Sequence, residues 1–406
     1  MKRLSVCDST NPTAPRAVGE LAEVDHRIYF EYDPEFLKNP RWLSPFKLPP
    51  EPGLLEHRDR TFGPLFGLFD DSLPDGWGLL LMDRVFRKNS ISPETISTLD
   101  RLAYMGSRTM GALTYHPETH IEDNHSDVVD LHNLAQDAHA VMEGTTEEIL
   151  PVLRRAGGSP GGARPKVVVG VKEDHLISGT EILPEGFTDW MVKFPSKRDA
   201  MNEGRMEYAY SLMARKAGIA MPPTRLFITS QGDAFFGMER FDRTRDRRIH
   251  MQTFGNLIHS NYRIPGCDYE QLMKITRVLT KNKVDVISAF RVMVFNIFAH
   301  NRDDHVKNFS FLLSSDNEWS LAPAYDLTFS FGPGGEHSMT VSGEGRKPTR
   351  SHIHRIAEQS GLTKTNADEV IHEVEAAILS WKDVAKEAGL STTISRRIES
   401  FITANP

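Results

Sequence analysis

The nonapeptide His300-Asn-Arg-Asp-Asp-His-Val-Lys-Asn308 follows the most apolar run of the chain, residues 292–299, at the end of the strongest predicted helix, residues 284–300. Within the nonapeptide, Asp303 can orient and deprotonate an incoming hydroxyl group, and Asn308 can bind a metal ion from the same loop. A further carboxylate, Asp326, stands at a strand or turn end, where it is suited to bridging Mg²⁺ to phosphates. The alternative is that Asp303 and Asp304 are only solvated residues of a surface loop.

The spacing from Asp303 to Asn308, with Arg302 before the aspartate, matches the catalytic loop H-R-D-L-x-x-x-N of protein kinases. Upstream, Lys193 lies in a predicted strand with apolar neighbours, and a buried lysine needs an anionic partner. Glu207, on the predicted helix 203–217, is the candidate partner. A strand lysine paired with a helix glutamate holds the α- and β-phosphates in protein kinases. The alternative is a surface lysine and an exposed glutamate.

A glycine-rich turn precedes this strand, between a predicted helix at 146–155 and a predicted strand at 167–171. Small residues there let backbone N–H groups approach a polyphosphate closely, although a plain flexible turn has the same composition. The candidate phosphate-binding residues of the turn are Gly161, Gly162, Ala163, Arg164 and Lys166.

Three competing motifs fail on their context. Residues 157–161 match G-x-S-x-G, but a nucleophile elbow needs the order strand, Ser, helix, and the predicted order here is the reverse. A Walker A loop fails because Ala163 follows Gly162 where a lysine is required. His300 and His305 do not share a helical face, so they are expected to orient the loop rather than bind a metal.

Six segments, in the same order and with compatible spacing, resemble the HipA family of serine/threonine kinase toxins between about residues 60 and 330. They are Phe69-Asp-Asp-Ser-Leu-Pro-Asp-Gly-Trp-Gly78, Ser159 with Gly161-Gly-Ala-Arg-Pro-Lys166, Val192-Lys-Phe-Pro195, Glu239-Arg-Phe-Asp-Arg243, Asp303-Asp-His-Val-Lys-Asn-Phe-Ser310 and Leu321-Ala-Pro-Ala-Tyr-Asp326. The resemblance implies an α+β, protein-kinase-like two-lobed fold with an added N-terminal α/β subdomain. It also implies ATP and Mg²⁺ as cofactors and phosphorylation of a protein serine or threonine.

The resemblance also implies roles for single residues. Asp303 corresponds to the catalytic aspartate, Asn308 and Asp326 to Mg²⁺ ligands, and Lys193 to a contact of the nucleotide phosphates. His305 stands where many protein kinases have lysine, so His305 or Lys307 is expected to stabilise the transferring phosphoryl group.

The segment 239–243 resembles the hinge, where backbone groups of Glu239 and Phe241 would meet adenine and Asp242 would reach the ribose. Ser159 matches the family's inhibitory autophosphorylation site. A phosphate there would favour a loop conformation different from the one that cradles ATP.

Composition sets the remaining expectations. With 48 Lys and Arg against 55 Asp and Glu, the net charge is −7. Contact with DNA is therefore expected only through a basic partner protein. The resemblance suggests that this partner is a helix-turn-helix antitoxin. The two cysteines fit a reducing compartment, with the cytoplasm as the default, and no apolar run is long enough to span a membrane.

Three parts are predicted: an N-terminal α/β subdomain (1–118), a nucleotide-binding lobe (140–243) and a mainly helical lobe with the catalytic loop (244–406). No titratable cluster in the first part suggests chemistry. In the third part, residues 367–388 are predicted to form one amphipathic helix.

The predicted function is that of an ATP-dependent serine/threonine protein kinase, the toxin of a toxin–antitoxin pair. Its substrate would be a protein of the translation machinery, such as an aminoacyl-tRNA synthetase, with autophosphorylation at Ser159. Two alternatives are a kinase-like pseudoenzyme that acts as a corepressor with a DNA-binding antitoxin, and a phosphotransferase acting on a small molecule.

Overall fold

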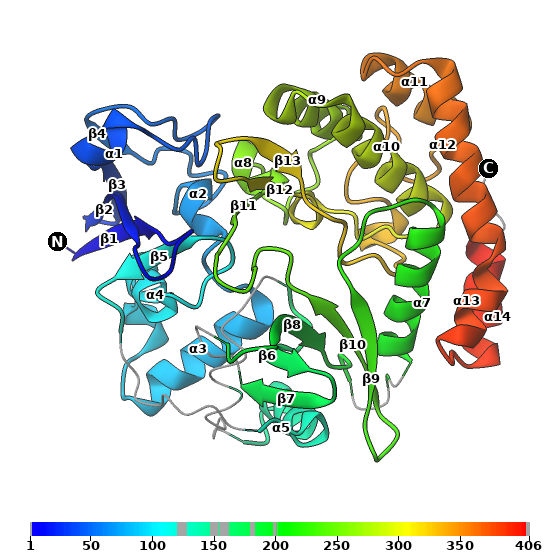
Figure 1. Ribbon diagram of the computed structural model, residues 1–406, viewed down its shortest axis with the longest axis horizontal. Coiled ribbons are helices and arrows are strands. Elements are labelled where there is room, and N and C mark those ends of the chain that lie inside the picture. The colour runs from blue at the N-terminus through cyan, green and yellow to red at the C-terminus, as the bar shows by residue number, and fades with distance from the viewer. Residues whose placement is uncertain are drawn as a thin grey trace.

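The N-terminal part of the chain folds around a five-stranded antiparallel sheet (Figure 1). The computed structural model describes residues 2–119, 128–146, 153, 162–178, 183–197, 200 and 202–402. Along the first strand, Leu4 and Val6 are buried while Arg3 and Ser5 are exposed, the alternation of a sheet with one face on the core. The strand order is β4-β3-β2-β1-β5, with bounds β1 (Lys2–Asp8), β2 (Arg16–Val24), β3 (Arg27–Tyr32), β4 (Leu54–Glu56) and β5 (Leu113–His116).

Short helices follow this sheet: α1 (Pro34–Lys38), α2 (Gly67–Asp70), α3 (Gly76–Lys88), η1 (Pro93–Thr95) and α4 (Thr98–Met105). Helix α4 starts at a Ser97–Asp100 capping box and contacts β1, β2 and β5. Helix α3 packs on α4 through the Phe86 and Tyr104 rings, and its buried Trp77 belongs to the apolar cluster of the next sheet, with Val167. The first part of the chain is therefore joined by packing to the second, and the three-part division stays a prediction.

The second sheet is also five-stranded and antiparallel, in the order β7-β6-β8-β10-β9. One face carries α7 (Glu203–Lys216), which contacts β9 and β10, and α5 (Leu131–Glu143) shares an apolar cluster with the valines of β6. The strands are β6 (Lys166–Lys172), β7 (His175–Ser178), β8 (Thr188–Lys193), β9 (Thr224–Ile228) and β10 (Ala234–Glu239).

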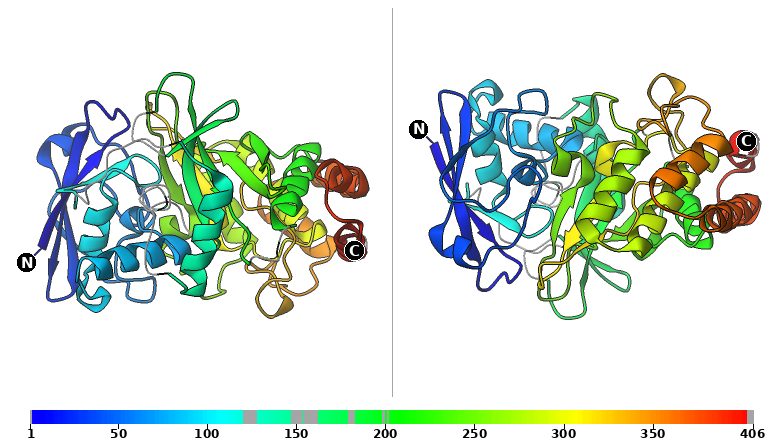
Figure 2. Two further views of the ribbon diagram at one scale, coloured as in Figure 1. Left: turned by 90° about the horizontal axis from the view of Figure 1, so that it is seen from below. Right: turned by 90° about the horizontal axis from the view of Figure 1, so that it is seen from above.

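The rest of the chain is mainly helical around a three-stranded sheet, β11-β12-β13. Helix α10 is apolar on almost every side and is buried at its centre, as a helix of that composition must be. The elements are β11 (His250–Thr253), α8 (Phe254–Ile258), α9 (Tyr269–Thr280), α10 (Lys283–Phe298), η2 (Val306–Asn308), β12 (Ser310–Leu313), β13 (Trp319–Leu321), η3 (Pro333–Gly335), α11 (Arg350–Gln359), α12 (Lys364–Leu379), α13 (Trp381–Glu387) and α14 (Thr392–Ile402). Figure 2 shows the N-terminal sheet at one end of the molecule and α13 and α14 at the other.

The prediction of one continuous helix over residues 367–388 is wrong in one respect. The structure divides it at Ser380, which ends α12 and begins α13. The Ser380 hydroxyl donates to the Ala377 carbonyl, a side-chain-to-backbone bond that competes with the helical ladder. None of the described helices is both long and apolar enough to cross a membrane.

Candidate active site

Lys193, at the end of β8, is the centre of a buried ion network. Its Nζ lies 2.5 Å from Glu207 Oε1 on α7 and also contacts Asp326 Oδ1. Burial alone would lower the pKa of this lysine, but the two carboxylates hold it above its ordinary value. The ion pair that the sequence predicts between Lys193 and Glu207 is confirmed, and Asp326 joins it from the other lobe.

The turn before β6 closes over the same network. Arg164 donates from Nη1 to Glu207 at 2.7 Å and from Nε to the Phe194 carbonyl at 2.7 Å. Lys166 is buried nearby, and burial lowers its pKa to about 8. Gly162 has φ 109°, a backbone conformation in which a residue with a Cβ would be strained, so this turn favours glycine.

The two adjacent aspartates after α10 have opposite environments. Asp304 is fully buried and accepts hydrogen bonds from Tyr269 Oη at 2.7 Å, His337 Nδ1 at 2.8 Å and the Ser338 amide at 2.8 Å. For Asp304, the interpretation as a solvating residue is therefore wrong.

Asp303, in contrast, is exposed and lines a cavity of about 910 Å³. Partial desolvation raises the pKa of its carboxyl, His305 opposes this, and Asp326 adds to it. A raised carboxyl pKa suits a group that accepts a proton. The Asn308 Nδ2 donates to the Asp303 carbonyl at 2.6 Å and closes the loop.

Asp326 sits at the meeting point of the two lobes in an unusual backbone conformation. Its φ is 54°, in the left-handed region that non-glycine residues rarely adopt and that is found at functional sites. Burial opposes the charge on its carboxylate, but Lys193 and Lys166 lower its pKa to about 2. Asp326 is therefore ionised at neutral pH.

The residues predicted to hold a metal fit a weakly coordinated Mg²⁺. Asn308 and Asp326 line the same cavity, and each offers an oxygen donor. In the part of the chain that the structure describes, no group of three or more His, Cys, Asp and Glu side chains could hold a metal ion. Mg²⁺ bound together with phosphates commonly uses only one or two carboxylates of the protein and keeps several waters, so this sparse set is compatible with it.

The predicted hinge, residues 239–243, borders a second cavity of about 120 Å³ with apolar walls from Met110, Met191 and Met238. The Phe241 ring lines this cavity and stacks on Tyr325, with ring centroids 5.6 Å apart. Such a slot suits a flat aromatic group.

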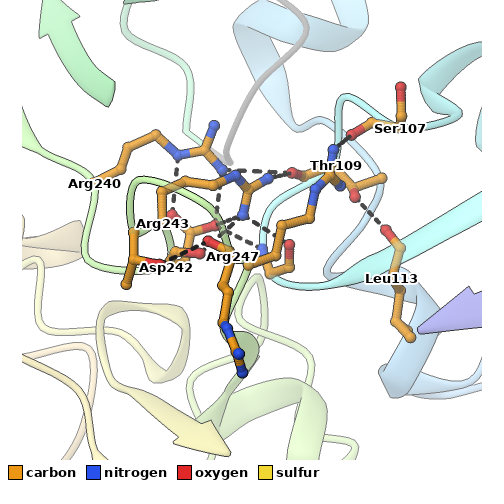
Figure 3. A network of polar contacts seen from close by, with 10 residues as sticks. Ser107, Thr109, Leu113, Arg240, Asp242, Arg243 and Arg247 are labelled. Atoms are coloured by element: carbon orange, nitrogen blue, oxygen red, sulfur yellow. Dashed lines mark hydrogen bonds and ion pairs between the residues drawn. The ribbon is translucent and has the colours of Figure 1, made fainter. Parts of the chain in front are cut away.

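The Asp242 carboxylate has a different destination from the one predicted. It is fully buried and accepts hydrogen bonds from Arg240, from Arg243 and from the Gly111 amide at 2.7 Å (Figure 3). Burial opposes its charge, but the two guanidinium groups hold its pKa well below the usual range. The prediction that Asp242 reaches the ribose is therefore corrected: the carboxylate clamps two arginines, which in turn bind the Thr109 carbonyl.

A model of the HipA-like C-terminal domain matches residues 158–381, and a model of the HipA N-terminal domain matches residues 13–116. The chain belongs to the HipA family. The fold is also that of the HipA in a Shewanella oneidensis toxin–antitoxin complex of HipA, HipB and operator DNA, with a TM-score of 0.72 and 15% identity over 98% of this chain and 95% of that one. The predicted fold class is confirmed.

Two curated relatives of this HipA-family chain come from Sinorhizobium fredii. "Putative kinase Y4dM" is 27% identical over 236 residues, 53% of this chain and 54% of the relative. "Putative kinase Y4mE" is 29% identical over 182 residues, 42% of this chain and 37% of the relative. The chain thus spans about half the length, or less, of these relatives.

The HipA fold brings together most of the residues predicted from the sequence. One cavity is lined by Gly162, Ala163, Arg164, Lys166, Lys193, Glu207, Asp303, His305, Asn308 and Asp326. Lys307 and Phe241 line the adjoining apolar cavity. Glu239 instead borders a separate cavity beside the hinge. Ser159 and Gly161 lie outside the described residues.

From the sequence, no titratable cluster in the first 118 residues suggests chemistry, but the structure places one at the cleft. Asp70, Asp71 and Asp75 reach the cleft of this HipA-family chain beside Lys307. The sequence shows them only as a turn rich in Asp, Ser, Pro and Gly, because Lys307 lies more than 230 positions further along the chain. The one available signal is the density of carboxylates at the start of a helix.

Proposed function

We propose that this HipA-family chain is an ATP-dependent kinase that phosphorylates a serine or threonine of a protein. The observation that carries the proposal is the ion network of Lys193, Glu207 and Asp326, in one cavity with Asp303 and Asn308. A strand lysine, a helix glutamate, a loop aspartate and two oxygen donors are the parts that phosphoryl transfer from ATP requires.

In the proposed reaction, the hydroxyl oxygen of the substrate forms a bond to the γ-phosphorus of ATP. The bond from that phosphorus to the β,γ-bridging oxygen breaks, and ADP leaves with the electron pair. Asp303 orients the hydroxyl and accepts its proton, for which its exposure and raised pKa are suited. Lys193, fixed by Glu207, holds the phosphates, so catalysis is mainly positioning and electrostatics.

Asn308 and Asp326 are the residues that would hold Mg²⁺, which supplies charge neutralisation on the phosphates. Adenine would occupy the apolar slot between the methionines, next to Phe241 and the backbone of the hinge. The ammonium group of Lys307 and the imidazole of His305 lie on the same loop as Asp303 and would face the transferring group.

The partners follow from the family and from charge. The Shewanella HipA is in a complex with HipB and operator DNA, and we propose a basic helix-turn-helix antitoxin for this chain. Its net charge of −7 supports DNA contact through that partner. A protein of the translation machinery, such as an aminoacyl-tRNA synthetase, is the proposed substrate, with Ser159 as the proposed autophosphorylation site.

The test is transfer of ³²P from [γ-³²P]ATP to the chain itself and to candidate proteins. Asp303→Asn should abolish incorporation, whereas Asp316→Asn, an isosteric change in the exposed β12–β13 loop, should leave it unchanged. Equal incorporation by wild type and Asp303→Asn would refute Asp303 as the catalytic residue. ATP-dependent thermal stabilisation without any transfer would instead support the corepressor alternative.

A further inference from the structure

The N-terminal part of the chain contributes side chains to the phosphate-transfer cleft. We infer that Asp70 and Asp75 are positioning residues that aim the Lys307 ammonium group at the transferring phosphoryl group. The inference rests on the proposed kinase function. It gives the N-terminal part a role in the chemistry that is exerted through Lys307, beyond the contacts that join this part to the two lobes.

Among the residues that the structure describes, the carboxylates that contact Lys307 all lie on this segment. Its Nζ lies 3.3 Å from Asp70 Oδ2 and 4.0 Å from Asp75 Oδ2, and 4.9 Å above the centroid of the Tyr262 ring. The lysine side chain is 18% exposed, so it is largely desolvated. Burial opposes its charge, but the carboxylates of Asp70, Asp71 and Asp75 raise its pKa. A long, flexible lysine stem needs such partners to hold one direction.

The two aspartates stand on a segment that is itself fixed. Asp70 ends α2, and Asp75 precedes α3, which starts at Gly76. Between them, Asp71 accepts hydrogen bonds from the Thr253 amide at 2.8 Å, the Thr253 hydroxyl at 2.9 Å and Asn256 Nδ2 at 2.8 Å. The segment is therefore anchored to β11 and α8, the elements beside the catalytic loop.

The same unit also touches the other walls of the cleft. The Trp77 amide donates to the Gly162 carbonyl at 3.2 Å, next to the phosphate-binding turn. At the hinge, Arg243 donates to the Thr109 carbonyl at 2.7 Å and to the Gly111 carbonyl at 2.8 Å (Figure 3). In Figure 1, α2 and α3 lie between the N-terminal sheet and the rest of the molecule. The hydrogen bonds to the turn and to the hinge thus help to fix the position of Asp70 and Asp75 relative to Lys307.

In the transfer step, Lys307 remains protonated and gives no proton. The hydroxyl proton goes to Asp303 and the electron pair leaves with ADP, so Lys307 acts only as a fixed positive charge. Asp70 and Asp75 keep that charge and its direction, and neither touches the reacting atoms. Their loss should therefore lower kcat more than it raises KM for ATP.

The test is a double-mutant cycle on the full chain with [γ-³²P]ATP. Asp70→Asn should lower kcat about tenfold, Lys307→Met by more, and the double variant no further than Lys307→Met alone, because Asp70 then has nothing to position. Asp25→Asn, in the exposed turn between β2 and β3 of the same unit, should match wild type. If Asp70→Asn lowers kcat by the same factor with and without Lys307, or has no effect, the inference is overturned.

A second measurement separates this inference from the proposed function. If wild type transfers no phosphate, the kinase proposal fails and the inference with it. If wild type transfers phosphate and Asp70→Asn keeps the wild-type kcat, only the inference fails. Because positioning acts on kcat more than on KM for ATP, ATP should raise the melting temperature of Asp70→Asn and Lys307→Met as much as that of wild type, and loss of this shift would overturn the inference.

Discussion

Replacing Glu207 by glutamine tests the centre of the cleft, because it removes one charge and keeps the shape. The Glu207 side chain is 3% exposed and accepts from Lys193 Nζ at 2.5 Å and from Arg164 Nη1 at 2.7 Å. A glutamine amide keeps one acceptor oxygen and turns its NH₂ group towards one of the two cations. One charge-assisted hydrogen bond, worth about 1.5–3 kcal/mol, is lost, and a cation is left without its partner.

We therefore expect Glu207→Gln to lower the free energy of unfolding by about 3 kcal/mol and to raise KM for ATP. Urea denaturation followed by circular dichroism at pH 7 measures the first, and initial rates of phosphate transfer measure the second. The matched control is Glu358→Gln on the exposed side of α11, expected to stay within about 0.5 kcal/mol of wild type. If both variants unfold like wild type, the ion network does not hold the lobe together, and the reasoning fails.

Two further substitutions probe the contacts of the N-terminal part. Asp242→Asn should lower the free energy of unfolding by about 3–5 kcal/mol at pH 7, because it leaves Arg240 and Arg243 buried without their carboxylate. Since folding lowers the pKa of Asp242, the stabilisation by its carboxylate is present above about pH 4 and is lost as the pH falls. Urea denaturation should therefore show that the free energy of unfolding depends less steeply on acid pH in the variant than in wild type. The same steepness in both proteins would contradict the clamp. Gly67→Ala would place a Cβ 1.9 Å from the Asn256 carbonyl oxygen and should lower the free energy of unfolding by about 1–3 kcal/mol. Its control, Gly63→Ala, would place a Cβ with nothing within 4 Å and should lower this free energy less in the same measurement. Equal losses would contradict a tight contact between α2 and α8.

The sequence predicts the cleft best where a residue's own chemistry forces its environment. A lysine in an apolar strand must find an anion, and Lys193 finds Glu207 on the next helix. The spacing from Asp303 to Asn308 likewise predicts two polar side chains that act from one loop, and both line the same cavity. These contacts are local in the fold, so pattern and chemistry are sufficient to find them.

Other features depend on packing between distant segments, which the pattern does not contain. The turn 70–76 is recognisable as a turn, but its carboxylates reach Lys307 only because α2 packs on α8. For Asp242, the family resemblance predicts a contact with the ribose. The arginines two positions before it and one position after it indicate a clamp, and the structure pairs both with its carboxylate.

The two lysines of the cleft share one electrostatic design. Lys193 lies between Glu207 and Asp326, and Lys307 lies between Asp70 and Asp75. A buried lysine with no partner would lose its proton, because burial lowers its pKa. In the proposed reaction, the phosphates of ATP would approach both lysines. Glu207 on α7 and Asp70 at the end of α2 would then keep Lys193 and Lys307 charged, because each of these carboxylates stays within reach of its lysine.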